Sequence, residues 1–301
     1  MARAGIGRKL VWRLEALLLD LASAILRLLP VDWVSDAGGA LLKWLGPLTP
    51  SHAIAARNID LAFPDLAADA RAALLKAQWE SLGRTFFEIQ VMDRITLASG
   101  RVEVIGGERL AEIAAAGEPV VFISGHFSNW EVMPLTIVQS GVVCQMTYRA
   151  ANNPYVDARI KASRASYGVR LFAPKGGEGS RELLQAMDRG ESVALMNDQK
   201  FNGGVAAPFF GHLAHTAAGP TRLALRFGSV LQPMSVQRLK GARFRVVVHE
   251  PIRLTSTGRR ADDLEAGVRQ VNAFVEARIR ERPAEWFWVH KRWPRDQYGK
   301  G

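Results

Sequence analysis

The stretch VVFISGHFSNWE, residues 120–131, joins an apolar run to a polar segment that starts at a glycine. Residues 120–124 are apolar and β-branched up to the final serine, a composition typical of a buried strand. The residues from Asn129 onward have the spacing of a helix. A strand followed directly by a helix is the unit from which parallel sheets covered by helices are built.

The same alternation extends along the chain in both directions. Strands are expected at 102–105, 120–124, 142–148, 169–172, 192–197, 230–237 and 244–249. Helices are expected at 66–92, 107–115, 129–140, 155–167, 179–189, 217–227 and 262–281. This pattern predicts an α/β fold with a mostly parallel sheet flanked by helices. In such sheets, ligands bind beyond the carboxyl ends of the strands.

The composition excludes several classes of protein. Of the 301 residues, 48% are hydrophobic and 23% are charged, which excludes a disordered or collagen-like chain. The single cysteine, Cys144, cannot form an internal disulfide or a cysteine-based zinc site. The net charge of +10 favours an anionic partner, such as acidic lipid headgroups or an acidic protein. The basic residues are scattered and form no nucleic-acid-binding motif, so we expect no nucleic acid partner.

The N-terminus contains an amphipathic helix. The basic residues Arg3, Arg8 and Lys9 precede an apolar run over residues 10–29. Four charged residues interrupt this run, and each costs about 2.5–3.5 kcal/mol at a bilayer centre, which argues against a simple span. At helical spacing the charges fall on one stripe, except for Glu15. We expect a helix lying in the membrane interface, with a helix packed on its own domain as the alternative.

A second largely apolar stretch continues this pattern. Residues 31–45 contain Trp33 and Trp44, and tryptophan is enriched at membrane interfaces. Pro47 and Pro50 then break the helical pattern. We therefore expect an N-terminal membrane-associating segment at 1–50 and an α/β domain at 51–301.

His126 lies where a general base is expected, between a strand's carboxyl end and a helix. His126 and Glu131 are five residues apart, about 500° on a helix, so they cannot share a helix face. They can meet only if His126 lies in the loop and Glu131 in the first helical turn. The carboxylate would then fix the tautomer that leaves the other ring nitrogen basic. Alternatively, Ser128-x-x-Glu131 is simply a capping box, and the two roles are compatible.

Other catalytic signatures are missing from the sequence. It contains no Gly-x-Ser-x-Gly elbow, no phosphate-binding loop, no Gly-x-Gly-x-x-Gly and no His-Glu-x-x-His. His212 and His215 have a spacing that metals use, but no third ligand accompanies them. We expect no metal and no permanent cofactor.

Five motifs in order resemble one family. They are residues 125–131, with His-x4-Glu; residues 58–64, with Asn-x4-Phe-Pro; Tyr148-Arg149 followed by residues 152–154; Asp198-Gln199 followed by residues 208–211; and residues 288–293, with Trp-x-His-x-Arg-Trp. Together they resemble the lipid A secondary acyltransferases (lauroyl and myristoyl transferases) of the glycerolipid acyltransferase superfamily. The resemblance covers about residues 8–295, and Glu131 differs from the aspartate of many superfamily members.

The resemblance implies a glycerol-3-phosphate acyltransferase-like fold and a specific reaction. An acyl chain would pass from acyl carrier protein to a hydroxyl of a Kdo-bearing lipid A precursor, at the cytoplasmic face of the inner membrane. His126 would act as the general base and Glu131 would orient it.

Arg149, Asp198 and Asn129 are the candidate substrate-binding residues. Arg149 and Asp198 each follow an expected strand. Arg149 is expected to bind a phosphate or carboxylate of the acceptor or to support the oxyanion, unless it forms only a surface ion pair. Asp198 is expected to orient Arg149 or to cap the next turn.

Two other functions remain open at this point. One is acylation of another glycolipid, such as a phosphatidylinositol mannoside, from acyl-CoA. The other is a membrane-surface binding protein without catalysis, in which the residues from His126 to Glu131 only cap a helix.

Overall fold

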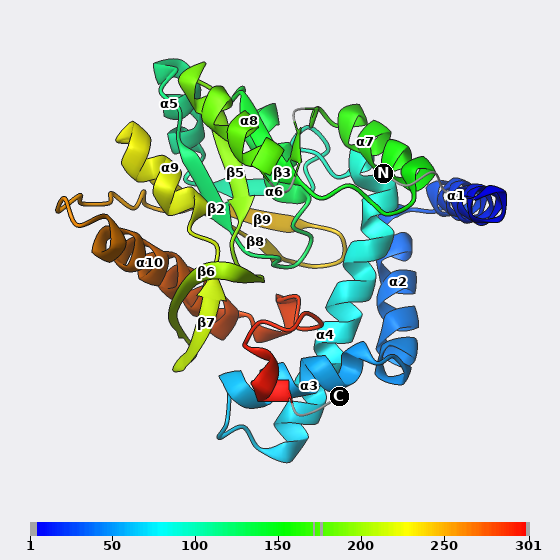
Figure 1. Ribbon diagram of the computed structural model, residues 1–301. Coiled ribbons are helices and arrows are strands. Elements are labelled where there is room, and N and C mark those ends of the chain that lie inside the picture. Colours follow the sequence, from blue (N-terminus) through cyan, green and yellow to red (C-terminus); the bar gives the residue numbers. More distant parts are fainter. Residues whose placement is uncertain (1–4, 171, 175–176, 299–301) are drawn as a thin grey trace.

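The computed structural model describes residues 5–170, 172–174 and 177–298. In this part of the chain, seven strands form one sheet in the order β1-β9-β8-β2-β5-β3-β4 (Figure 1). The strands are β1 (Val102–Ile105), β2 (Val121–Ser124), β3 (Cys144–Tyr148), β4 (Phe172–Pro174), β5 (Ser192–Met196), β8 (Leu231–Arg238) and β9 (Phe244–Val248). Every neighbouring pair is parallel except β8 and β9. The expected mostly parallel sheet is confirmed.

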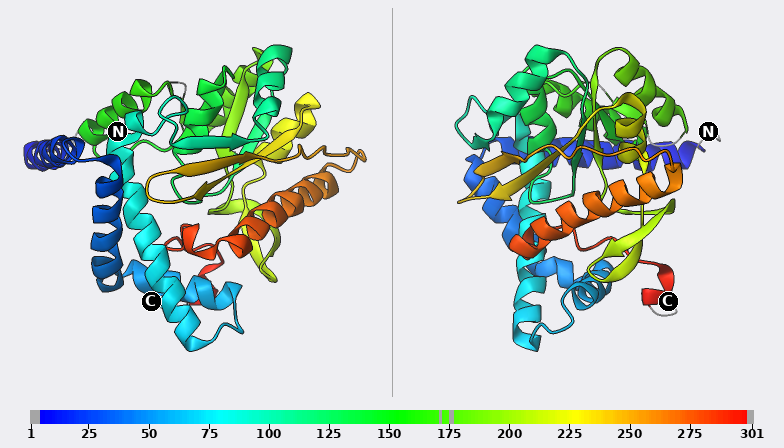
Figure 2. Two further views of the ribbon diagram at one scale, coloured as in Figure 1. Left: turned by 180° about the vertical axis from the view of Figure 1, so that it is seen from behind. Right: turned by 90° about the vertical axis from the view of Figure 1, so that its left-hand side faces the viewer.

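Helices cover both faces of this sheet (Figure 2). They are α5 (Gly107–Ala116), α6 (Val132–Gln139), α7 (Pro154–Ser166), α8 (Gly177–Asp188), α9 (Gly219–Phe227) and α10 (Arg260–Glu281). Because side chains alternate along a strand, Val121 and Ile123 of β2 pack with α8 and α9. Phe122 points to the opposite face and joins the larger cluster, which includes α6.

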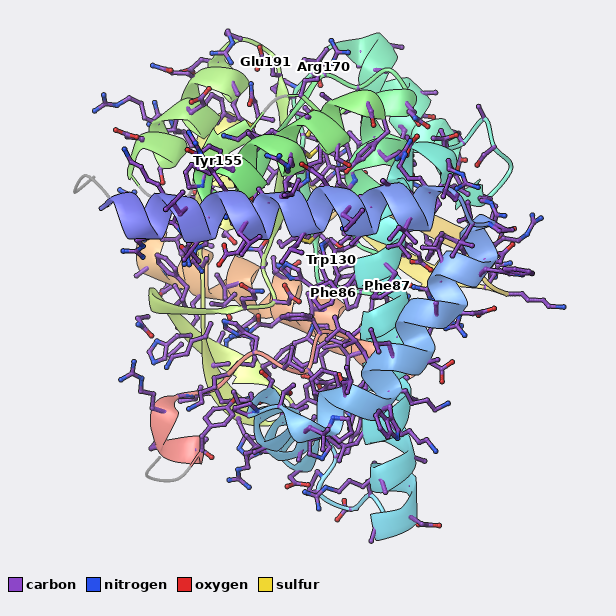
Figure 3. The ribbon with its side chains drawn as sticks, turned by 90° about the vertical axis from the view of Figure 1, so that its right-hand side faces the viewer. Phe86, Phe87, Trp130, Tyr155, Arg170 and Glu191 are labelled. Atoms are coloured by element: carbon purple, nitrogen blue, oxygen red, sulfur yellow. The ribbon has the colours of Figure 1, made fainter. Side chains whose placement is uncertain are left out.

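The N-terminal third forms a helical layer beside the sheet. It comprises α1 (Ile6–Arg27), α2 (Val31–Leu45), α3 (Ser51–Ala62) and α4 (Ala68–Glu88), followed by the 3-10 helix η2 (Ile89–Arg94). α2 packs along α4, where Gly38 and Gly83 let the two backbones approach so closely that a Cβ on either glycine would clash. α1 instead lies across one face of the molecule, next to α7 (Figure 3). Among the described helices, none combines the length and the apolar composition needed to cross a membrane.

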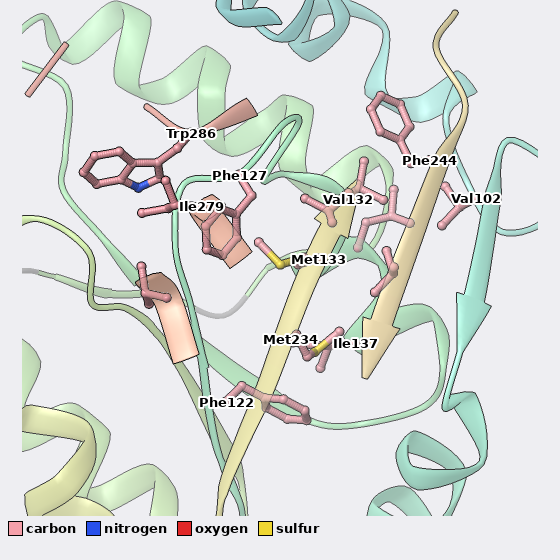
Figure 4. Close-up of a cluster of buried hydrophobic side chains, with 14 of the residues drawn as sticks. Val102, Phe122, Phe127, Val132, Met133, Ile137, Met234, Phe244, Ile279 and Trp286 are labelled. Carbon is pink, nitrogen blue, oxygen red and sulfur yellow. The ribbon is translucent and has the colours of Figure 1, made fainter. Parts of the chain in front are cut away.

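The larger buried cluster joins the sheet to the C-terminal segment (Figure 4). Phe122, Met133 and Met234 lie between the sheet and α6, while Phe127 packs near Trp286. The strand-like pairing of Phe127 with Trp286 places the C-terminal segment directly against the loop that follows β2.

Two features differ from the expectations. α3 was not predicted; it is a short helix that directly follows Pro47 and Pro50, two residues that predict a break in the helical pattern. The antiparallel hairpin of β6 (Lys200–Phe209) and β7 (His212–Thr216) was also missed. Its glycines and proline weaken the strand pattern that a sequence can show.

Candidate active site

The carboxyl ends of three neighbouring strands bring the candidate residues together. β2 and β5 are in parallel register, with Ser124 opposite Met196. His126 and Asp198 each lie two residues farther along, so the register places them side by side. Arg149 directly follows β3, on the other side of β5. The strand order thus assembles the site at the edge where α/β sheets bind ligands.

The His126 ring is bound to Asp198. The distance between Nδ1 of His126 and Oδ1 of Asp198 is 2.8 Å, and the backbone N–H of His126 donates to Oδ2 at 2.7 Å. The indole N–H of Trp286 also donates to Oδ2, at 2.8 Å. Burial alone would raise the pKa of Asp198, but the charge of His126 and these hydrogen bonds lower it well below its usual value. Asp198 is therefore an ionised partner for the imidazole.

The His126 ring lies in an aromatic environment. Trp130 contacts it edge-on at 5.2 Å between ring centroids, and Phe287 lies at 5.9 Å. The side chain is 18% exposed, so the ring is reachable, while Asp198 behind it is 2% exposed. In the described part of the chain, Nε2 of His126 has no hydrogen-bond partner, which leaves this nitrogen for a substrate.

The expected hydrogen bond between His126 and Glu131 is not formed. Glu131 is bound instead by Arg164 of α7, whose Nε donates to Oε2 at 2.8 Å and whose Nη2 donates to Oε1. The Tyr167 hydroxyl donates to the same carboxylate at 3.0 Å. Burial and the negative charge of Glu131 together raise the pKa of Tyr167. The structure thus assigns Glu131 to an ion pair that joins α6 to α7, and gives His126 a different carboxylate.

The alternative capping box is also wrong. α6 begins at Val132, so Glu131 is the residue before the helix and cannot be its third residue. Ser128 has a left-handed backbone with φ of 44°, and its buried hydroxyl has no hydrogen-bond partner in the structure. The segment departs from the sequence pattern because the Ser128 backbone binds elsewhere, to Glu285 and Thr85.

Asn129 takes part in the scaffold. Its side chain is fully buried, donates to Glu88 at 3.0 Å and accepts from the N–H of Glu131 at 3.3 Å. Because these groups occupy its amide, the substrate-binding role expected for Asn129 does not fit its position. The expected pairing of Asp198 with Arg149 is replaced by the pairing with His126.

A cavity of about 350 Å³ opens beside His126. Its wall contains Phe122, Met133, Ile137, Met146, Val169 and Met234, and is therefore largely apolar. Its polar groups include Arg149, Gln199 and the ion pair of Glu131 with Arg164, together with the hydroxyl-bearing Ser124, Thr147 and Tyr148. Arg149 is exposed and forms no hydrogen bond within the described residues, so its guanidinium is available to a ligand. A long apolar chain fits such a cavity, with its polar end near His126 and Arg149.

Sequence reasoning missed the C-terminal contribution to the site. Besides Trp286, the backbone N–H of Phe287 donates to the carbonyl of His126 at 3.1 Å. Trp288, Arg292 and Trp293 are completely buried, so these side chains of the motif at 288–293 pack inside the molecule. The many aromatic residues in this segment indicated that it is important, but the sequence did not show what they pack against.

Comparisons with known proteins identify the family of the chain. Residues 13–295 match the family model of the bacterial lipid A biosynthesis acyltransferases. The chain is 24% identical to a lipid A biosynthesis lauroyltransferase of Escherichia coli over 246 residues, which are 78% of this chain and 76% of that relative. It is 23% identical to a lipid A biosynthesis palmitoleoyltransferase of Escherichia coli over 80% of this chain and 78% of the relative.

A third relative is named for a different acceptor. It is a phosphatidylinositol mannoside acyltransferase of Mycolicibacterium smegmatis, 24% identical over 73% of this chain and 71% of the relative. The family match over nearly the whole chain confirms the resemblance that the five motifs indicate. The chain therefore belongs to the bacterial lipid A biosynthesis acyltransferase family and is an acyltransferase.

Proposed function

We propose that this enzyme transfers a fatty acyl chain from acyl carrier protein to a hydroxyl of a Kdo-bearing lipid A precursor. The observation that carries the proposal is the position of His126. Its ring is held by a buried, ionised Asp198 and lies at an apolar cavity of about 350 Å³. A base beside an apolar cavity suits a reaction between a hydroxyl and a fatty acyl thioester.

The chemistry needs only groups of the chain and the two substrates. Asp198 holds the proton on Nδ1 of His126, so Nε2 accepts the proton of the acceptor hydroxyl. The hydroxyl oxygen forms a bond with the thioester carbonyl carbon, and the carbon–sulfur bond then breaks. The proton on Nε2 passes to the departing thiolate, which restores the base. Backbone N–H groups or Arg149 would support the oxyanion.

Arg149 suits the recognition of an anionic acceptor. Its guanidinium lines the cavity and carries donors in a planar fork that matches phosphate and carboxylate oxygens. The acceptor implied by the family carries both kinds of group. We assign Arg149 to binding the acceptor close to the reacting hydroxyl.

The outer face of α1 supports a position at a membrane. Seven large apolar side chains on this helix are more than half exposed: Leu10, Val11, Leu14, Leu17, Leu18, Leu21 and Ile25. Trp33 and Trp44 of α2 are also exposed, and Arg8 and Lys9 lie at the start of α1. Apolar side chains flanked by cations fit a bilayer with acidic headgroups. We place the enzyme at the cytoplasmic face of the inner membrane.

A second acceptor class has one observation in its favour, the similarity to the phosphatidylinositol mannoside acyltransferase. In that case acyl-CoA would be the donor. We favour the first interpretation because the matching family and two of the relatives are named for lipid A biosynthesis, and the net charge of +10 suits an acidic carrier protein.

One assay distinguishes these possibilities. The purified enzyme in mixed micelles is offered acyl carrier protein and coenzyme A thioesters of several chain lengths, each with a lipid A precursor or a phosphatidylinositol mannoside, and products are identified by mass. We expect the lipid A precursor with acyl carrier protein to give the highest kcat/KM. A higher value for the mannoside with coenzyme A would replace this proposal with the second.

The base is tested by His126→Ala and Asp198→Asn. Loss of a general base typically lowers the rate by about 10²–10⁴-fold, so we expect His126→Ala to lose at least about 100-fold in kcat. Asp198→Asn favours the wrong tautomer and should cause a loss of similar order. The matched control is His212→Ala, a histidine outside the cavity, which should retain activity. If His126→Ala turns over at the wild-type rate, His126 is not the general base.

A further inference from the structure

The loop that carries Arg149 is bound by α1. The amide of Asn153 donates two hydrogen bonds to this helix, to the carbonyl of Trp12 and to the carboxylate of Glu15, both at 2.8 Å. The amide oxygen of Asn153 caps α7 by accepting from the N–H of Tyr155 at 2.9 Å. Asn153 is only 7% exposed, and its buried side chain connects α1, α7 and the loop at 149–153.

The same loop is held on its other side by Asp157 of α7. This carboxylate accepts from the Tyr148 hydroxyl at 2.6 Å and from the N–H of Ala151 at 2.8 Å. Burial and the bond to Asp157 raise the pKa of Tyr148 to about 12, so the hydroxyl remains a donor at neutral pH. Arg149 thus lies in a loop that Asp157 of α7 binds at Tyr148 and at Ala151, and that α1 binds farther along at Asn153.

Apart from Ala16 and Leu26, which pack against the body, the attachment of α1 to the rest of the molecule is largely polar. Arg27 binds Asp93 at 2.6 Å, Ser23 binds Gln90 at 2.7 Å, and Asp20 pairs with Arg159 of α7. These contacts are exposed or half-buried, and such pairs contribute little net stability in water. Ala16 is the one residue of α1 buried in the described structure. Figure 3 shows α1 lying along α7, with Tyr155 on one side and Trp130 on the other.

The usual arrangement of an amphipathic helix is therefore reversed. The polar side of α1 faces the protein, and its leucines face outward. The sequence placed Glu15 off the charged stripe, but in the structure it contacts the body with the others. A bilayer that takes up the outward face stabilises the helix along its whole length. The membrane would then supply the free energy that the polar contacts lack.

We propose that Glu15 is a positioning residue, which transmits the docking of α1 on a membrane to the Arg149 loop through Asn153. This inference rests on the proposed function, since it needs Arg149 to bind an anionic lipid acceptor. With α1 seated on the bilayer, Glu15 and the Trp12 carbonyl hold Asn153 and the loop is set for the acceptor. Without this contact the loop keeps its bonds to Asp157 and the cap that the Asn153 oxygen forms on α7, but the amide nitrogen of Asn153 is no longer held.

The test compares Glu15→Ala with two other variants on vesicles that contain the lipid A precursor. Asp20→Ala is the matched control, because it also removes a bond from α1 to α7 but does not touch the Arg149 loop. Glu15→Gln is the rescue, because its amide oxygen can still accept from Asn153. We expect Glu15→Ala to raise the acceptor KM by about tenfold, the effect of one lost charge-assisted hydrogen bond. The KM for the acyl donor should stay within about twofold.

Three measurements make the result decisive. Vesicle binding and the acceptor-independent hydrolysis of the thioester should be the same in Glu15→Ala and wild type, because anchoring and the His126 base are intact. An unchanged acceptor KM would overturn the inference, and so would an equal rise in Asp20→Ala. Weakened vesicle binding in Glu15→Ala would show that Glu15 only helps to attach the enzyme to the membrane and does not position the Arg149 loop. If instead the wild-type enzyme transfers no acyl chain to any acceptor, the proposed function fails, and this outcome is distinct from the others.

Discussion

Asp198 shows how a single buried carboxylate remains charged. At 2% exposure, desolvation favours the neutral acid, yet three donors surround the two oxygens: the ring and backbone N–H of His126 and the indole of Trp286. Hydrogen bonds to the charged form lower its pKa. The carboxylate is therefore ionised across the pH range in which an imidazole base works, and it keeps the ring oriented.

A second buried charge lies behind this pair. Arg292 is fully buried, and its hydrogen-bond partners among the described residues are neutral: the carbonyl of His215, the hydroxyl of Thr216 and the amide of Asn272. Burial lowers its pKa to about 10, while the negative charge of Asp198 acts in the opposite direction. Arg292 is thus a cation at neutral pH that interacts electrostatically with Asp198.

We expect Arg292→Met to move the acid limb of the kcat/KM profile to higher pH. The cation of Arg292 and the negative charge of Asp198 attract each other, so removing the cation makes Asp198 easier to protonate, and a protonated Asp198 no longer orients the ring of His126. The shift is measured from initial rates between pH 5 and 9, with activity at each pH normalised to stable protein. Arg292→Lys keeps the charge but loses the fork, and should show the wild-type limb. If kcat/KM falls at the same acidic pH in the wild type and in both variants, Arg292 only supports packing.

The sequence was sufficient to find His126 but insufficient to find its partner. The strand, the glycine and the following helix place His126 at the sheet edge by local signals alone. Asp198 is 72 residues away and reaches the ring only because β5 lies next to β2 in a particular register. Strand order and register depend on packing across the whole sheet, so the nearest carboxylate in the chain, Glu131, was the wrong choice of partner.

At the scale of elements, strand and helix periodicity predicted most of the α/β part. β1 has the expected bounds, and most other sheet strands differ from expectation by one or two residues. The expectation for β4 was farther off, because this edge strand is short. Long-range contacts between elements were not predictable. Residues 58–64 and 288–293 were separate motifs in the sequence, and in the structure they meet through Asn58.

We expect Asn58→Ala to lower both stability and turnover. Asn58 is fully buried on α3 and donates to the carbonyls of Trp288 and His290 at 2.6 and 2.8 Å. Each buried acceptor left unsatisfied costs about 1–3 kcal/mol, so the free energy of unfolding should fall by roughly 3 kcal/mol. Turnover should fall at temperatures where the variant stays folded, because the released segment carries Trp286, a donor to Asp198.

Urea unfolding and kcat measured on the same preparation test this prediction. Asn202→Ala, an exposed asparagine on the β6–β7 hairpin, is the matched control and should change neither quantity. A loss of stability with full turnover would show that the C-terminal segment supports the fold without ordering the base.

At the scale of the whole molecule, charge and apolar surface act over different distances. The net charge of +10 attracts an anionic surface, but at physiological salt this attraction is screened within about 8 Å. The apolar face of α1 acts only on contact and is insensitive to salt. A protein that uses both should show vesicle binding that weakens with salt but does not vanish.

The last prediction separates these two contributions. Leu14, Leu18 and Leu21 are 57%, 57% and 58% exposed on α1, and each gains about 1 kcal/mol when a bilayer completes its burial. The triple substitution to serine should therefore weaken binding to acidic vesicles roughly 100-fold, as measured by sedimentation, and leave the circular dichroism spectrum in solution unchanged. Leu213→Ser, at 61% exposure on the β6–β7 hairpin, is the control. Because the charge is the same in every variant, the salt-dependent part of the binding should persist in the triple variant. Full binding by the triple variant at high salt would mean that α1 does not enter the bilayer.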